Sequence, residues 1–192
     1  DHIEAVLAKG VPMVFYDRDY PSLKTSRVIV DDYVGAREAS LHLIDQGCKR
    51  IAHIQAASNL TIAKDRLRGL TDVLKENNIP FPDHYLQVCQ TGSIEDGVKA
   101  MTNLLSSPER PDGLFANNDV LAMGAMKAIR KAGLRIPEDI AVVGFSNWLY
   151  SSMIEPPLSS VDQPGFLMGQ EAAKLLIREI EQSDKDEDIE IV

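Results

Sequence analysis

Six polar side chains in this sequence lie where a small molecule could be bound. Five directly follow β-type runs and one lies early in a helical pattern; they are Asp17, Arg18, Asn118, Ser146, Gln163 and Arg66. In parallel sheets covered by helices, ligands bind beyond the carboxyl ends of the strands, where the loops gather. Arginine and aspartate can each bind two neighbouring hydroxyl groups, and asparagine both donates and accepts. The set therefore predicts a site for a polyhydroxylated or heteroaromatic small molecule.

Several of these positions also have a simpler structural explanation. Asp119 opens a predicted helix and is better explained as its cap than as a ligand contact. Asp17 could simply end a strand, and Arg66 could pair with a carboxylate on the surface. The nearest acidic candidates for that pair are Asp65 and Glu95. Three aromatic side chains at and after the long strand either line a pocket or pack internally: Phe145, Trp148 and Tyr150.

The sequence contains no motif that indicates catalysis. There is no GxSxG, GxxxxGKS, GxGxxG or HExxH pattern, and the four histidines lack metal-ligand spacing. Ser146 is the one candidate nucleophile at the predicted site, and no histidine is expected near it. The two cysteines, Cys48 and Cys89, form no CxxC pair and are expected to be buried. We therefore expect no catalytic residue, no metal and no cofactor.

The positions of the candidate residues depend on an alternation of strands and amphipathic helices. Buried strands are predicted at residues 11–16, 27–30, 51–55, 86–89, 113–116, 140–145, 158–161 and 189–192. Helical patterns lie between them, including one opened by Ser93 and a last one over residues 165–180. This rhythm predicts an α/β fold with doubly wound parallel sheets.

Composition limits the partners of this chain. Its 192 residues carry a net charge of −9, and Lys64 to Arg68 is the nearest approach to a basic cluster. Direct DNA binding requires a basic surface, so this chain is not expected to bind DNA by itself. No apolar run is long enough to span a bilayer.

Long stretches of the chain resemble the effector-binding domain of LacI/GalR repressors. These include GVPMVFYDR (10–18), VDDYVGAREASLHLIDQGCKRIAHI (30–54), RLRGL (66–70) and PPLSSVDQPGFLMGQEAA (156–173). The most specific piece is GLFANNDVLAMGAMKAIRKAGLRIPEDIAVVGFSN (113–147). Together they cover nearly the whole chain in the order and spacing of that family.

The resemblance implies a two-lobed clamshell, like that of periplasmic sugar-binding proteins, with the ligand between the lobes. Residues 1–47 and 158–183 would form a partial N-terminal lobe, and residues 48–157 and 184–192 the C-terminal lobe. The chain would cross between lobes near Gly47, near Leu158 and again after the last helix. A helix-turn-helix DNA-binding head, which the family places before this domain, is expected to be absent.

The resemblance also assigns roles to single residues. Asp17 and Arg18 match an Asp-Arg pair that ends a ligand-facing strand, and Arg66 matches an arginine that clamps the ligand. Asn118 and Gln163 match residues that face or contact it. Ser146 departs from the family, which has a sugar-binding aspartate there, and Gly92 stands where several relatives place a stacking aromatic. A sugar is the expected effector, a purine less so, and Arg66→Ala is expected to abolish the response while leaving the fold intact.

The mechanism implied is allosteric regulation of transcription in the cytoplasm. Effector binding would change the angle between lobes in a homodimer, and operator DNA would be bound only through the absent head. Met123 and Met126 lie on the helix that resembles the family's dimer contact, although Met126 could equally be buried within one lobe. The main alternative is the periplasmic sugar-binding component of a transporter, which has the same fold.

Overall fold

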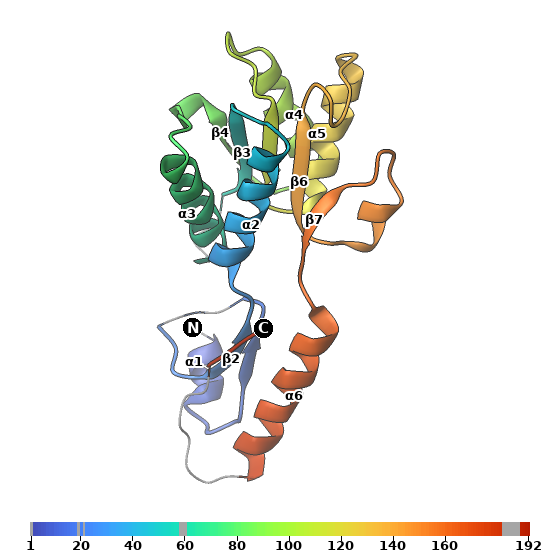
Figure 1. Cartoon of the computed structure of the whole chain (residues 1–192). Helices are drawn as coiled ribbons and strands as arrows, with labels where there is room; N and C mark the ends of the chain where they lie inside the picture. The colour runs from blue at the N-terminus through green and yellow to red at the C-terminus, as the bar shows by residue number, and fades with distance from the viewer. Residues whose placement is uncertain (1, 19, 21, 58–60, 182–188) are drawn as a thin grey trace. The chain divides into compact units, whose positions relative to one another are not determined.

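The structure is a computed structural model of the chain. It describes all residues except 1, 19, 21, 58–60 and 182–188. The chain divides into two compact units (Figure 1). The smaller unit comprises residues 1–31 and 164–192, and the larger comprises residues 32–163. Each unit is described by itself below.

The larger unit is built on a five-stranded parallel sheet with the order β4-β3-β5-β6-β7. Its strands are β3 (Ile51–Ala56), β4 (Leu86–Cys89), β5 (Gly113–Ala116), β6 (Ala141–Ser146) and β7 (Ser159–Asp162). The order runs outward from β3 in both directions, as expected of a doubly wound sheet. All carboxyl ends therefore lie at one edge, which gathers the loops that follow β3, β5 and β6.

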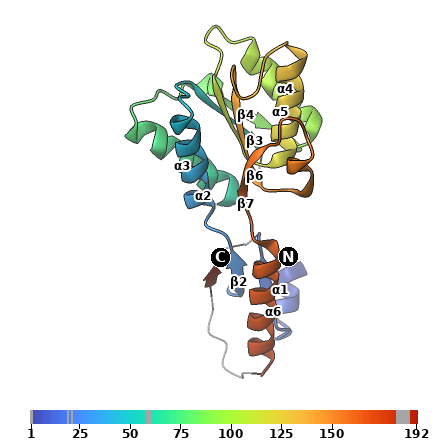
Figure 2. The ribbon, with the colours of Figure 1, turned by 45° about the vertical axis from the view of Figure 1, so that its right-hand side comes forward.

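Helices cover both faces of this sheet (Figure 2). One face carries α2 (Asp32–Asp45) and α3 (Thr61–Glu76), and the other carries α4 (Ile94–Leu105) and α5 (Asp119–Lys131). Two short 3-10 helices lie at Asp83–Tyr85 and Leu149–Ser152. Alternate strand residues supply the two cores, because successive side chains point to opposite faces. Phe115 and Phe145 pack with Leu43 and Leu70 on the α2–α3 face, whereas Leu114 packs on the α4–α5 face.

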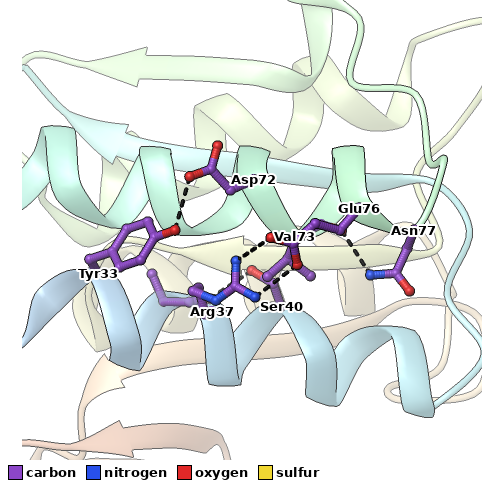
Figure 3. A network of polar contacts seen from close by, with 8 residues as sticks. Tyr33, Arg37, Ser40, Asp72, Val73, Glu76 and Asn77 are labelled. Atoms are coloured by element: carbon purple, nitrogen blue, oxygen red, sulfur yellow. Dashed lines mark hydrogen bonds and ion pairs between the residues drawn. The ribbon is translucent and has the colours of Figure 1, made fainter.

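The α2–α3 pair packs closely and is bridged at its surface (Figure 3). A side chain at Gly69 would place its Cβ 2.5 Å from the carbonyl oxygen of Tyr33, so a glycine is required at this crossing. The Arg37 guanidinium donates to both carboxylate oxygens of Glu76 at 2.9 and 2.8 Å. The hydroxyl of Tyr33 donates to Asp72 at 3.0 Å.

The smaller unit contains a three-stranded parallel sheet with the order β1-β2-β8. Its elements are α1 (His2–Leu7), β1 (Val14–Tyr16), β2 (Ser26–Ile29), α6 (Gly165–Glu181) and β8 (Ile189–Ile191). Met168 and Leu175 of α6 are buried against Val28 and Val30. Much of the apolar surface of α6 is exposed, including Phe166 at 90%.

The α/β fold with doubly wound parallel sheets is confirmed, but the expected lobe boundaries are wrong in three places. Residues 32–47 belong to the larger unit, because α2 packs on α3 and the strands of that unit. Residues 158–163 also belong there, since β7 pairs with β6. Residues 189–191 pair with β2 of the smaller unit, not with the larger one. The remaining part of the expected segment, 184–188, lies outside the described residues.

Candidate functional site

Arg66 lies at the carboxyl edge of the larger sheet, and its guanidinium is almost fully buried. Its Nε donates to Asp32 Oδ1 at 2.7 Å, and Nη2 lies 2.7 Å from the same oxygen. Nη1 donates to the main-chain carbonyl of Asn117. The guanidinium carbon lies 3.5 Å from the centre of the Phe145 ring, which is a close cation–π contact. A positive charge is thus held at the strand ends in one orientation.

The predicted surface partners of Arg66 are therefore wrong. Asp65 instead pairs with Arg68 at 3.0 Å, and Arg66 is 4% exposed. Its partner Asp32 was not selected as a candidate from the sequence. Asp32 is nevertheless a polar residue that closely follows a predicted strand, as most of the other candidates do. Because the pair is buried, we now expect Arg66→Ala to destabilise the fold, since the variant would leave the Asp32 carboxylate buried without its positive partner.

Asn118, and not Asp119, caps α5, so the cap role expected for Asp119 is wrong. Asn118 is the N-cap of α5, and its Oδ1 accepts from the amide of Leu121 at 2.9 Å. Asp119 is 1% exposed and follows the N-cap residue as the first residue of α5. The Asn118 side chain still lies at the strand-end edge, where its Nδ2 is 3.8 Å from the position that a Cβ on Gly92 would occupy.

The carboxylate of Asp119 ties the loop after β6 to β7. It accepts from the amide of Trp148 at 2.6 Å, from the hydroxyl of Ser151 at 2.6 Å and from the hydroxyl of Ser160 at 2.7 Å. A side chain at Gly144 would place its Cβ 2.2 Å from Oδ1 of Asp119. Asp119 therefore fixes the start of the loop that carries Trp148.

Ser146 and Gln163 are brought together at the ends of β6 and β7. The Ser146 hydroxyl donates to Oε1 of Gln163. Ser146 and the following Asn147 both have positive φ, at 108° and 47°, which is uncommon for residues other than glycine. Asn147 donates from Nδ2 to Asp162 at 2.9 Å. Together with Arg66 and Asn118, these residues place four of the six predicted ligand contacts at one edge of the larger unit.

Gly92 has a structural reason to be glycine. Its φ is +77°, and an added Cβ would lie 3.1 Å from the Cβ of Ala56. Both the backbone conformation and the space therefore disfavour the stacking aromatic that relatives were expected to place there.

The other two predicted ligand contacts lie in the smaller unit, after β1. Asp17 is half-buried with a φ of 63°, and its amide donates to the carbonyl of Val28 at 3.0 Å. Arg18 is exposed. Their roles remain predictions, as does any participation with the residues of the larger unit.

The aromatic and methionine side chains divide between core and surface. Phe145 is buried under Arg66, whereas Trp148 and Tyr150 are about half exposed and meet edge to face with centroids 4.7 Å apart. Met126 is 3% exposed within the core of the larger unit, so its predicted role at a dimer interface is wrong. Met123 is only half-buried and remains a candidate for that interface.

Burial favours the neutral forms of His53 and Cys48. Burial lowers the pKa of His53 to about 4, and burial raises the pKa of the Cys48 thiol to about 11. Cys48 and Cys89 are both buried, as expected. Among the described residues there is no group of three or more metal-binding side chains, and no helix is long and apolar enough to cross a membrane.

A groove in the larger unit lies apart from the predicted ligand contacts. It measures about 450 Å³ between α2 and the edge strand β7, and its polar lining comes from Glu38, His42, Ser159, Ser160 and Asp162. His42 is exposed here. None of the six predicted contacts lines this groove.

Comparison with known proteins is consistent with this geometry. The family described as "Periplasmic binding protein-like domain" matches residues 41–191. The ribose operon repressor of Halalkalibacterium halodurans is 37% identical over 177 residues, which cover 92% of this chain and 52% of that protein. The chain thus spans about half the length of the curated relatives it matches.

Solved structures give the same assignment. A putative LacI transcriptional regulator from Bacillus cereus subsp. cytotoxis has a TM-score of 0.90 and 32% identity, covering 99% of this chain and 67% of that one. A structure described as a transcriptional regulator CelR–cellobiose complex has a TM-score of 0.90 and 31% identity, covering 99% and 58%. The chain therefore belongs to the periplasmic-binding-protein-like family, among the effector domains of LacI-family transcriptional regulators.

Proposed function

We propose that this chain is the effector-sensing core of a repressor-type transcriptional regulator and that its effector is a sugar. The observation that carries the proposal is the cellobiose complex of CelR, whose fold matches 99% of this chain with a TM-score of 0.90. The strand-end edge of the larger unit supplies polar groups suited to hydroxyls. Arg66, Asn118, Ser146 and Gln163 are its contacts in this proposal, and Asp17 and Arg18 are candidate ligand contacts within the smaller unit.

The replacement of the family's aspartate by Ser146 changes how hydroxyls would be bound. A carboxylate can accept from two sugar hydroxyls, whereas the Ser146 hydroxyl is engaged with Gln163. In this proposal Ser146 and Gln163 bind the sugar as a pair, with one oxygen accepting and one amide group donating. The proposed chemistry is recognition, and no residue has a catalytic role.

We further propose that the chain forms a homodimer and acts on operator DNA through a helix-turn-helix head outside these residues. Leu149 and Met153 lie in the segment between β6 and β7 and are 66% and 67% exposed. Two large apolar side chains exposed to this extent favour a contact with another protein chain. In this proposal the half-buried Met123 of α5 also belongs to the dimer interface. The net charge of −9 favours DNA binding by another part of the protein. A transcriptional role places the protein in the cytoplasm.

A thermal-shift screen tests the effector class. The chain is heated with neutral sugars, including ribose and cellobiose, and in parallel with purine bases and nucleosides. We expect a rise in the melting midpoint with at least one sugar, because a ligand that binds only the folded state stabilises it. A rise with a purine and none with any sugar would contradict the proposal.

A further inference from the structure

The turn that follows β6 has a main-chain conformation that its residues do not favour. β6 ends at Ser146, and Ser146 and Asn147 have φ angles of 108° and 47°. Two consecutive residues with side chains at positive φ are uncommon, because the main chain crowds the Cβ atom of an L-residue there. Such a conformation persists only where the surrounding structure holds it. The contacts that hold this turn matter for recognition, because Ser146 is one of the proposed effector contacts.

Two successive main-chain amides in this turn are hydrogen-bonded, directly or through a hydroxyl, to one carboxylate. The amide of Asn147 donates to the hydroxyl of Ser160 at 2.9 Å, and that hydroxyl donates to Oδ1 of Asp119 at 2.7 Å. The amide of Trp148 donates directly to Oδ2 of Asp119 at 2.6 Å. An amide can only donate and a carboxylate can only accept, so the Ser160 hydroxyl satisfies both partners by accepting from one and donating to the other. Asp119 thus holds both amides, one of them through Ser160.

The carboxylate of Asp119 is itself held in place. Asp119 is 1% exposed and is the first residue of α5, whose N-cap is Asn118. The main chain of β6 passes so close that a Cβ on Gly144 would lie 2.2 Å from Oδ1 of Asp119. The hydroxyl of Ser151, in the short 3-10 helix after the turn, donates to Oδ2 at 2.6 Å. A carboxylate with so little room to move is a rigid anchor for the turn.

The pairing of β6 with β7 does not depend on the side chain of Ser160. The two strands pair through their main chains, with Gly144 opposite Ser160 and Ser146 opposite Asp162. Asn147 also donates from Nδ2 to Asp162 at 2.9 Å, but both of these side chains are exposed, so water competes for this bond. The hydroxyl of Ser160 therefore stabilises the turn and not the sheet.

We propose that Asp119 and Ser160 are positioning residues for effector binding. Neither is a proposed effector contact, and both act through the turn that they hold, which directs the Ser146 side chain toward Gln163. A turn that is ordered before the effector arrives need not be ordered during binding, so loosening it weakens binding without removing a contact. This inference rests on the proposed sugar effector and adds two residues on which its affinity depends.

Amide hydrogen exchange, followed by NMR on the full chain without effector, tests whether the turn is held in this way. We expect Ser160→Ala to speed exchange of the Asn147 amide at least about tenfold, because that amide loses its acceptor. Ser159→Ala makes the same change at the exposed neighbour on β7 and should leave this rate unchanged. Equal exchange of the Asn147 amide in Ser160→Ala and in the wild-type chain would overturn the proposal, whether or not any sugar binds.

Isothermal titration calorimetry with ribose and cellobiose tests the effect on recognition. We expect Ser160→Ala to bind the sugar that the wild-type chain binds about fivefold to tenfold more weakly, which corresponds to one lost hydrogen bond. Ser160→Thr retains the hydroxyl and should bind within about twofold of the wild-type affinity. Ser159→Ala should leave the affinity unchanged. The comparison of alanine with threonine separates a role of the hydroxyl from a general effect on stability.

These outcomes separate the inference from the proposed function. If the wild-type chain binds a sugar and Ser160→Ala binds it equally well, the effector proposal stands and the positioning role is overturned. Equal weakening in Ser160→Ala and Ser160→Thr would also overturn that role, because the loss would not come from the hydroxyl. If no sugar binds the wild-type chain, the sugar effector is overturned together with the positioning role. Should Ser160→Ala fail to fold, Ser160→Cys offers a weak acceptor of similar size, and the same weakening and faster exchange are expected.

Discussion

Replacing Arg66 by alanine should destabilise the larger unit strongly, because the substitution leaves the buried carboxylate of Asp32 without its positively charged partner. The Arg66 and Asp32 side chains are 5% and 10% exposed and lie 2.7 Å apart. Removing one partner of such a buried pair costs about 3–5 kcal/mol, and the lost cation–π contact with Phe145 adds to that cost. We therefore expect Arg66→Ala to lower the free energy of unfolding by about 4 kcal/mol, or the melting midpoint by roughly 10 °C.

A double-mutant cycle isolates the ion pair from the rest of the arginine. Asp32→Leu and Arg66→Met are measured singly and together by urea denaturation, followed by circular dichroism. Each single variant should be destabilised by several kcal/mol, whereas the double variant should recover much of that loss, because it leaves no unpaired charge. Arg66→Lys serves as a control that retains the charge without the two-nitrogen contact to Asp32.

The opposite pattern would refute this reasoning. A loss of less than about 1 kcal/mol in Arg66→Ala would mean that the pair behaves as an exposed one in solution. Additive losses in the double variant would mean that Asp32 and Arg66 do not interact. In either case the contact at the strand ends would not hold the guanidinium in place.

Three further predictions concern other buried and exposed groups. Asp119→Ala should lower the free energy of unfolding by about 3 kcal/mol, because the three hydrogen bonds that its carboxylate accepts are lost. The fluorescence emission of Trp148, the single tryptophan, should shift as well. Unchanged emission would contradict a role of Asp119 in holding this loop. His53 has a folded pKa of about 4 against about 6.5 when unfolded, so the unfolded state binds more protons between these values and stability should fall by about 3 kcal/mol as the pH drops from 6.5 to 4. That fall should be smaller in His53→Gln, and an equal fall in both proteins would contradict the assignment. Arg37→Ala removes an exposed pair with Glu76 and should leave the melting midpoint nearly unchanged even at low salt; a large drop would show that water does not screen this pair.

The alternation of apolar runs and helical patterns was sufficient to predict the parallel α/β fold. Each strand of the larger unit lies within a residue or two of its predicted position, because strands buried on both faces stand out as short apolar runs. The lobe boundaries could not be found in this way. Residues 32–45 form a helix whose buried face consists mostly of small residues such as Gly35, Ala36 and Ala39. Which sheet this helix covers depends on long-range packing against α3 that no local pattern encodes.

The candidate site was predicted in type but not in detail. Polar residues after strand ends indicated Arg66, Asn118, Ser146 and Gln163, and all four lie at the carboxyl edge of the larger sheet. Their partners depend on side-chain geometry, so the pairing of Arg66 with Asp32 and the capping of α5 by Asn118 in place of Asp119 were not foreseen.

Hydrogen–deuterium exchange, with and without the neutral sugar that stabilises the chain most, tests the sugar-binding role most directly. Bound sugar should slow amide exchange at the segments that follow the strands of the larger unit, around residues 55–57, 117–118, 146–148 and 163. Protection confined to other parts of the chain, or none at a saturating sugar concentration, would contradict a sugar site at this edge.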